Sequence, residues 1–333
     1  MPAINSGTIL VTGASGFLGT YIVQELLKRG FKVRAVVRDD KKGEYMQKNW
    51  PGTEYVIVKD MNAPGAYDHV VDGIAGIIHV ASPLDVSNTG HPDEVIGPAV
   101  VGVENLLKAV EGSKTLKRFV QIGSIAAIAG LPDGTPKTYT EETWNDAAVD
   151  ECYKLGAPAP GPLKYIASKN KAERAFWKWF ETKRSFDAVA ILPGMILGPP
   201  KEYGSDKAIG GTNSWVAAFA GKDNFGTDFE FWSTVDVRDV ADATVSALSV
   251  PEAAGERFII AAAPLFGNEV AAIAEEYFPS APTKANKDPA FQKQQKDRAT
   301  VFDGSKATRI LGTQYRPKEE SIRDLFEVVK SRQ

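Results

Sequence analysis

Residues 8–19 read Thr-Ile-Leu-Val-Thr-Gly-Ala-Ser-Gly-Phe-Leu-Gly, and this stretch decides the fold. The apolar run at residues 8–12 predicts a buried strand, and the helical spacing over residues 18–29 predicts a helix that ends at Gly30. The glycines between them let the backbone approach a pyrophosphate closely, at a helix N-terminus with free N–H groups. A strand, a glycine-rich turn and a helix in this order predict a dinucleotide-binding unit, although the spacing is GxxGxxG rather than GxGxxG. The alternative is a turn that only connects the strand and the helix.

Strands and helices alternate along the first 200 residues. Apolar runs predict further strands at residues 32–37, 55–58, 76–80, 118–122 and 188–192, and helical spacing predicts helices at 98–110 and 165–183. Residues 131–162 are rich in Pro, Gly, Asp and Thr and are predicted to be loop. The alternation predicts an α/β fold with a Rossmann-type, doubly wound parallel sheet.

Composition sets broad limits on function. The 333 residues carry 39 Lys and Arg against 42 Asp and Glu, a net charge of -3, so neither a nucleic-acid nor a membrane partner is expected. Cys152 is the only cysteine, which fits a reducing compartment. The first residues do not resemble a secretory signal, and no apolar run approaches a membrane span, so we expect a cytoplasmic protein. Three scattered histidines and one cysteine predict no metal site.

The end of the second predicted strand favours NADP over NAD. NAD sites commonly place a carboxylate there, but this chain has Arg38, which can stack on adenine and pair with a 2′-phosphate. Lys42 adds positive charge, whereas Asp39 and Asp40 argue the other way. Asp60 is predicted to contact the adenine, with a turn-forming role as the alternative.

A second domain is predicted after about residue 200, where the alternation weakens. We assign residues 1–200 to an NADP-binding Rossmann domain, to which residues 234–248 cross back. Residues 201–233 and 249–333 are assigned to a smaller C-terminal α/β substrate-binding domain. Within it, residues 201–230 are predicted to be mostly loop with a helix near 214–220, and amphipathic helices are predicted at 269–277 and 318–329.

Three polar residues form a candidate catalytic group. Tyr165 and Lys169 are four residues apart and share one face of a predicted helix, where a cation can lower the pKa of a phenol. Ser124 follows a predicted strand at the edge where ligands bind in open α/β sheets. Together they are suited to polarising and protonating a carbonyl oxygen, although a Tyr–Lys pair or a turn serine alone is a weak signal.

The whole chain resembles the extended short-chain dehydrogenase/reductases. The most similar group is dihydroflavonol-4-reductase-like, which includes fungal NADPH-dependent aldehyde and ketone reductases. The resemblance rests on VTGASGFLG (11–19), VRAVVRD (33–39), GAYDHVVDG (65–73), IIHVASP (77–83), RFVQIGS (118–124), YIASK (165–169), LPGMILGPP (192–200), VDVRDVADA (235–243) and DGSKATRILG (303–312). Many members carry an Asn where this chain has Ala99, so a proton relay through Asn is not expected.

This resemblance implies the site residues. Ser124, Tyr165 and Lys169 would be catalytic. Tyr165 and Lys169 would also bind the cofactor. The other residues of the cofactor site would be Gly13, Ser15, Gly16, Phe17, Leu18, Gly19, Arg38, Lys42, Asp60, Met61, Ala81, Ser82, Pro83, Pro193, Gly194 and Ile196. Trp215, Phe225 and Trp232 are predicted to line the substrate pocket beside Ser124 and Tyr165, which would suit an apolar or aryl ketone. The alternative places these aromatic residues in the core of the small domain.

The predicted activity is NADPH-dependent reduction of an aldehyde or ketone to an alcohol by hydride transfer. One alternative is an NAD(P)-dependent dehydrogenase or epimerase of the same superfamily acting on a sugar nucleotide or a hydroxysteroid. Another is a regulator that binds NADP without turnover, although such proteins usually lack the Ser–Tyr–Lys set. The expected partner is a small carbonyl compound, and both a monomer and a homodimer fit the sequence.

Overall fold

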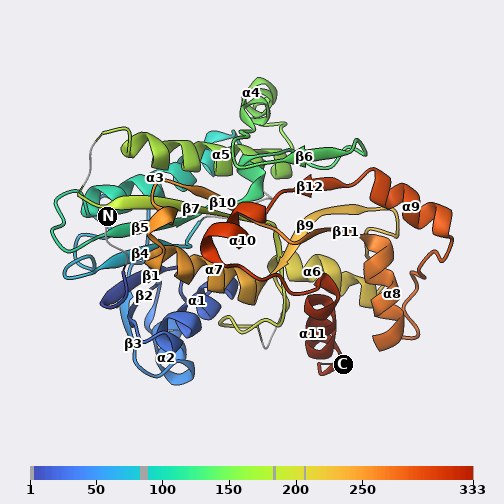
Figure 1. The fold of residues 1–333 in the computed structure, drawn as a ribbon, viewed down its shortest axis with the longest axis horizontal. Coiled ribbons are helices and arrows are strands. Elements are labelled where there is room, and N and C mark those ends of the chain that lie inside the picture. Colours follow the sequence, from blue (N-terminus) through green and yellow to red (C-terminus); the bar gives the residue numbers. More distant parts are fainter. Residues whose placement is uncertain (1–3, 83–88, 183–184, 206–207, 333) are drawn as a thin grey trace.

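A seven-stranded parallel sheet forms the centre of the computed structural model, which describes residues 4–82, 89–182, 185–205 and 208–332 (Figure 1). The strand order is β10-β7-β5-β4-β1-β2-β3, and every pair is parallel. The strands are β1 (Thr8–Thr12), β2 (Lys32–Val37), β3 (Thr53–Ile57), β4 (Gly76–His79), β5 (Arg118–Ile122), β7 (Asp187–Pro193) and β10 (Arg257–Ile260). The predicted doubly wound α/β fold is confirmed.

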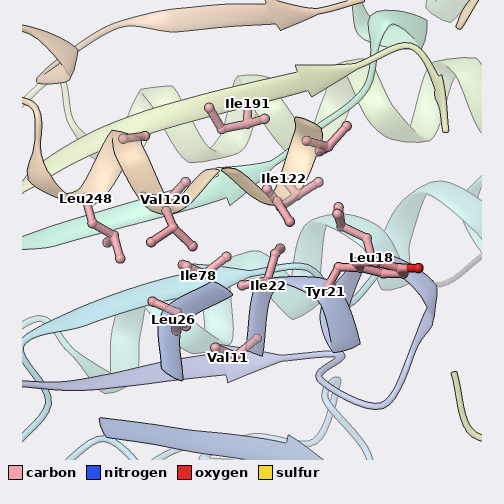
Figure 2. Close-up of a cluster of buried hydrophobic side chains, with 14 of the residues drawn as sticks. Val11, Leu18, Tyr21, Ile22, Leu26, Ile78, Val120, Ile122, Ile191 and Leu248 are labelled. Carbon is pink, nitrogen blue, oxygen red and sulfur yellow. The ribbon is translucent and has the colours of Figure 1, made fainter. Parts of the chain in front are cut away.

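Helices cover both faces of this sheet because neighbouring strand residues point to opposite sides. Val120 of β5 packs in one core with α1 (Phe17–Lys28) and α7 (Val237–Ser249), as Figure 2 shows. Phe119, its neighbour, packs in another core with α3 (Asp93–Ala109) and α5 (Gly161–Trp179). Two further helices, α2 (Asp40–Asn49) and α10 (Ser305–Leu311), lie beside β3 and β10.

A third core, separate from the two that flank the sheet, lies beyond the carboxyl ends of the parallel strands. It contains a three-stranded sheet of β8 (Met195–Leu197), β9 (Glu230–Asp236) and β11 (Ala263–Phe266). Three helices pack around it: α6 (Gly211–Ala217), α8 (Gly267–Tyr277) and α11 (Lys318–Lys330). A separate parallel pair joins β6 (Lys137–Tyr139) to β12 (Thr300–Phe302). The remaining elements are α4 (Asp146–Leu155), α9 (Pro289–Asp297), η1 (Ile125–Ala127), η2 (Ala218–Ala220) and η3 (Pro251–Ala253).

Three predictions about local structure are wrong. The predicted loop at 131–162 contains β6, α4 and the start of α5, because α4 buries Val149 and Cys152 against α5. The helix predicted from residue 98 begins five residues earlier, with Pro98 inside α3. Helix α2 was not predicted, because it is mostly polar and has only two buried residues. It begins where the Asp39 side chain accepts a hydrogen bond from the Lys42 N–H.

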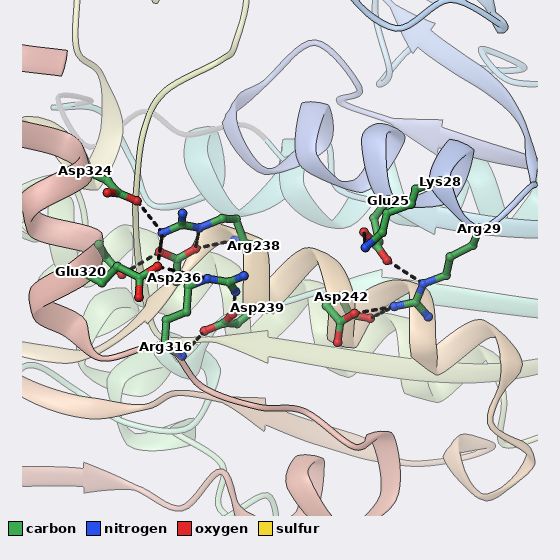
Figure 3. A network of polar contacts seen from close by, with 11 residues as sticks. Glu25, Lys28, Arg29, Asp236, Arg238, Asp239, Asp242, Arg316, Glu320 and Asp324 are labelled. Atoms are coloured by element: carbon green, nitrogen blue, oxygen red, sulfur yellow. Dashed lines mark hydrogen bonds and ion pairs between the residues drawn. The ribbon is translucent and has the colours of Figure 1, made fainter. Parts of the chain in front are cut away.

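The C-terminal helix is fastened to the β9–α7 corner by ion pairs (Figure 3). Arg238 lies between the buried Asp236, at 2.7 Å, and Asp324 of α11, at 2.8 Å. The Ser321 hydroxyl donates to Asp236 at 2.7 Å, and Arg316 pairs with Asp239. These contacts fix α11, which closes the third core. Among the described residues, no helix combines the length and apolar character needed to cross a bilayer.

Arg118, at the start of β5, connects the central sheet to the end of helix α7. Its side chain is 1% exposed and contacts Asp187 of β7 through Nε–Oδ1 and Nη2–Oδ2 distances of 2.6 and 3.0 Å. Its Nη1 donates to the carbonyls of Ala247 and Val250, each at 2.6 Å. A buried guanidinium needs this full set of acceptors, because an unpaired charge in the interior is costly.

Arg118→Met should therefore lower the free energy of unfolding by about 3 kcal/mol, because it leaves the Asp187 carboxylate and two carbonyls without their donor. Urea unfolding followed by circular dichroism measures this. Lys28→Met is the control, since Lys28 is 73% exposed in its pair with Glu25 and should cost less than about 1 kcal/mol. Equal effects in the two variants would contradict the prediction.

Candidate functional site

The glycine turn leaves the N-terminus of α1 open. Gly13 has a φ of +65°, and the Gly16 N–H donates to the Gly13 carbonyl at 3.0 Å. A Cβ on Gly19 would lie 2.1 Å from the same carbonyl oxygen, so the helix packs against the turn only because this position is glycine. Gly16 is the N-cap and offers no side chain to the first free N–H groups. A helix N-terminus of this kind favours an anion.

A cleft of about 750 Å³ opens over this turn. It is lined by twelve of the predicted cofactor residues: Gly13, Ser15, Gly16, Phe17, Leu18, Gly19, Arg38, Lys42, Asp60, Met61, Ala81 and Ser82. Five predicted cofactor residues lie outside that lining: Tyr165 and Lys169 on α5, and Pro193, Gly194 and Ile196 at the link from β7 to β8. Pro83 falls outside the described residues. The volume is in the range of ordinary ligand pockets.

Glu202 and Tyr203 also line the cleft, although the sequence did not point to them. The Tyr203 N–H donates to the Ser15 carbonyl at 3.2 Å, beside the glycine turn. The Tyr21 and Tyr45 hydroxyls donate to the carbonyls of Pro199 and Lys201, each at 2.8 Å. Tyr203 and its neighbour Glu202 thereby line the cleft, although some 185 residues separate them from the turn. Nothing in the local sequence indicates such a contact.

The side chains at the end of β2 divide into two roles. Arg38 is exposed and lines the cleft with Lys42. The Asp39 carboxylate instead accepts the Lys42 N–H at 3.0 Å, as the cap of α2. Asp60 lines the cleft, and its Oδ1 also accepts the Asn62 N–H at 2.9 Å, which is the turn-forming role given as its alternative.

Ser124, Tyr165 and Lys169 come together beyond the carboxyl end of β5. The Ser124 Oγ accepts the Ala126 N–H at 3.1 Å and so starts the short helix η1. The Ser124 side chain also lies close enough to the Tyr165 phenol to lower its pKa. Lys169 follows one turn later on α5, with Nζ 5.5 Å from the centre of the Tyr165 ring. Residues that lie 41 positions apart in sequence therefore form one group.

Burial dominates the electrostatics of this group. It raises the pKa of the Tyr165 phenol, an effect that the Ser124 side chain partly offsets. The expected lowering of this pKa by Lys169 is therefore not the net direction in the structure. Burial also lowers the pKa of Lys169 to about 8, because the ammonium loses hydration.

Ion pairs fix helix α5 behind the group of Ser124, Tyr165 and Lys169. Glu173 is buried one turn after Lys169 and contacts Arg257 of β10 through both oxygens, at 2.7 and 3.1 Å. On the outer side, Arg174 pairs with Asp146 of α4 at 2.5 Å. The helix therefore has a fixed rotation about its own axis, which sets where its polar side chains point.

The three predicted substrate residues separate into two places. Trp232 packs on the same small cluster as Tyr165, and its Nε1 donates to the Gly130 carbonyl at 3.0 Å. Phe225 instead belongs to an exposed aromatic cluster. Its ring centre lies 5.9 Å from that of Trp215 and 4.5 Å from that of Phe229, on which it stacks. Of the three predicted residues, Trp232 is the one that the structure brings to Tyr165.

The chain was compared with known proteins. The model of the NAD dependent epimerase/dehydratase family matches residues 9–261. This chain belongs to that family. Among its relatives, aldehyde reductase 2 of Sporidiobolus salmonicolor is 33% identical over 95% of this chain and 94% of its own. Cinnamoyl-CoA reductase CAD2 of Medicago truncatula is 34% identical over 100% of this chain and 98% of its own.

A solved family structure shares nearly the whole fold. The yeast methylglyoxal/isovaleraldehyde reductase Gre2, crystallised with NADPH, matches with a TM-score of 0.85 at 26% identity. The match covers 97% of this chain and 98% of Gre2. The resemblance to extended short-chain dehydrogenase/reductases is thereby confirmed.

The lowered pKa of Lys169 is directly testable. Acylation of its amine by an amine-reactive reagent should increase as the pH rises through about 8, because only the neutral amine reacts. Exposed lysines of the same digest should follow an ordinary pKa of about 10.4 and serve as the internal reference. Peptide mass spectrometry measures both, and a Lys169 midpoint equal to the reference would contradict the prediction.

Proposed function

We propose that this chain is an NADPH-dependent reductase that converts an aldehyde or ketone into an alcohol. The observation that carries the proposal is that the Ser124 side chain lies close enough to the Tyr165 phenol to affect its pKa, with Lys169 one helical turn away. Lys169 lines a small cavity that shares Ala81 and Ser82 with the cleft over the glycine turn. The names of the relatives, which include aldehyde and methylglyoxal reductases, support the same class of reaction.

The cleft fits a dinucleotide phosphate. Glycines keep the start of α1 clear of side chains, so that its N–H groups can hold a pyrophosphate. Arg38 and Lys42 would hold the 2′-phosphate at the end of β2, where NAD sites commonly carry a carboxylate. The use of Asp39 as a helix cap supports NADPH over NADH, since this carboxylate is engaged with the Lys42 N–H.

The protein's part in the reaction follows from its three polar groups. NADPH, when bound, supplies the hydride. Ser124 and Tyr165 would both donate hydrogen bonds to the substrate carbonyl oxygen, and Tyr165 would transfer its proton as that oxygen gains charge. The raised pKa keeps the phenol protonated until then. The Lys169 ammonium would stabilise the phenolate that remains.

We further propose that the central sheet and the third core bind different molecules. Residues 1–200, with 234–248, would bind the cofactor, and residues 201–233 and 249–333 would bind the substrate. Trp232, which packs near Tyr165, favours an apolar or aryl carbonyl compound. The reaction is placed in the cytoplasm, where the free, buried Cys152 would stay reduced.

Tyr165→Phe should lower turnover by roughly 100-fold or more, because it removes the single proton donor. Dissociation constants for NADPH, from its fluorescence, should stay within about twofold of wild type. Absorbance of the reduced nicotinamide measures turnover with an aryl ketone, a β-keto ester, an α-dicarbonyl and an aliphatic aldehyde. Tyr153→Phe is the matched control, since that exposed phenol contacts only Asp93 among the hydrogen bonds of the described residues. Near-normal turnover of Tyr165→Phe would exclude the proposed role, and NADPH binding without any turnover would favour a sensor.

Arg38→Gln should weaken NADPH binding by roughly 10- to 100-fold and leave NADH binding unchanged, since it removes a charged partner of the 2′-phosphate only. Titrations with both nucleotides measure the effect. Arg309→Gln, which changes an exposed arginine of α10, is the control. A parallel loss of affinity for both nucleotides would assign Arg38 to another part of the cofactor.

A further inference from the structure

A row of buried polar side chains crosses the sheet at its carboxyl edge. Thr12, His79 and Gln121 are direct register partners on β1, β4 and β5. Register partners on parallel strands point to the same face, and this row faces the layer of α3 and α5. The His79 ring lies 6.2 Å from Phe119, which in turn contacts Phe176 of α5. His79 is 1% exposed and Gln121 is 5% exposed.

The hydrogen bonds of Thr12 fix the tautomer of His79. The Thr12 Oγ1 accepts the N–H groups of Val80 and Ala81, each at 3.1 Å. Its own proton is therefore free for the His79 Nδ1, which lies at 2.7 Å. Burial, together with the charge of Lys169, lowers the pKa of His79 to about 3, so the ring is neutral. Its one N–H must then be on Nε2.

Two atoms of this row lack hydrogen-bond partners within the part of the chain that the structure describes. They are the His79 Nε2, a donor, and the Gln121 Oε1, an acceptor, and both are fully buried. Leaving such groups unpaired destabilises the folded protein, because each has lost its hydrogen bonds to water. Buried polar atoms without protein partners commonly bond to an ordered water.

A cavity of about 10 Å³ lies next to Gln121, roughly the space that one water needs. Gln121 lines it from β5 and Lys169 from α5, and apolar Ala99 and Val103 of α3 close it. Glu173 also lines it, but its two carboxylate oxygens contact Arg257. Lys169 therefore meets one uncharged, unpartnered acceptor here, the Gln121 amide oxygen.

We propose that this cavity is a one-water site through which Gln121 positions Lys169. The water accepts a hydrogen bond from the Lys169 ammonium and donates one to the Gln121 Oε1. The Gln121 oxygen then has a partner, and the ammonium is held toward the sheet beside the Tyr165 ring. The assignment of Gln121 as a positioning residue rests on the proposed catalytic role of Lys169.

This site would oppose the effect of burial on Lys169. An acceptor behind the ammonium stabilises its charged form, so Gln121 would help keep Lys169 protonated near neutral pH. The charged and titratable groups facing Lys169 are Tyr165 and Glu173 on its own helix, His79 on β4, and Arg257 on β10 through its pair with Glu173. His79 is neutral and Glu173 is paired with Arg257. The water and Gln121 are therefore the groups through which a substitution can change the pKa of Lys169.

Three variants separate this role from simple packing. Gln121→Met keeps the length of the side chain without the acceptor, and Gln121→Glu adds a carboxylate of nearly the same shape. Val103→Ile extends the opposite wall into the cavity and leaves Gln121 intact. Gln47→Met, at an exposed position of α2, is the matched control.

The pH midpoint of Lys169 acylation is the first readout, and it does not depend on activity. It should fall by about one pH unit in Gln121→Met and in Val103→Ile, rise in Gln121→Glu and stay unchanged in Gln47→Met. The turnover number should fall about tenfold in Gln121→Met while the dissociation constant for NADPH stays unchanged.

Equal midpoints in all variants would overturn the proposal, as would shifts of the same sign in Gln121→Met and Gln121→Glu, which indicate packing alone. If Gln121→Met fails to fold, Val103→Ile and Gln121→Glu still give opposite expected shifts. Loss of the proposed function is seen separately: Tyr165→Phe would then retain turnover, or the wild type would show none, whereas the acylation midpoints test the water site in either case.

Discussion

The parallel pairing of β1, β4 and β5 is the constraint on which the site depends. Because the strands run in one direction, their carboxyl ends meet at one edge of the sheet (Figure 1). The glycine turn follows β1, Ala81 and Ser82 follow β4, and Ser124 follows β5. The cleft and the proposed catalytic group are therefore neighbours for a topological reason, as in other open α/β sheets.

Burial then determines how the polar groups at this edge behave. Arg118 and the Glu173–Arg257 pair are buried with their acceptors or counter-charges, so they stabilise the arrangement of strands and helix α5. Tyr165, Lys169 and His79 have fewer partners for their charged forms. Burial therefore raises the pKa of Tyr165 and lowers those of Lys169 and His79, which favours the neutral form of each group. Groups that anchor the fold are paired, whereas the groups proposed to act in catalysis are held in partly unsatisfied surroundings.

Strongly periodic segments were predicted well, and polar or distant features were not. Six of the seven strands of the central sheet, and helix α1, follow from apolar runs and helical spacing in the sequence, whereas β10 was not predicted to belong to this sheet. Helix α2 escaped prediction because its stability depends on a cap at Asp39 and on contact with β3 rather than on an apolar face. The α4 segment reads as loop because of its flanking prolines and glycines, yet Val149 and Cys152 find a partner surface on α5.

The sequence by itself determined the glycine turn, the alternation of strands and helices, and the residues Ser124, Tyr165 and Lys169, because local spacing encodes each of them. Tertiary packing alone brings Glu202 and Tyr203 to the cleft, and Trp232 rather than Trp215 to the cluster on which Tyr165 packs. It also leaves the Gln121 Oε1 and the His79 Nε2 without hydrogen-bond partners among the residues that the structure describes. These facts depend on which elements pack together. Distance along the chain says nothing about such contacts, and the balance of burial and hydrogen bonding sets the pKa of each group only once they form.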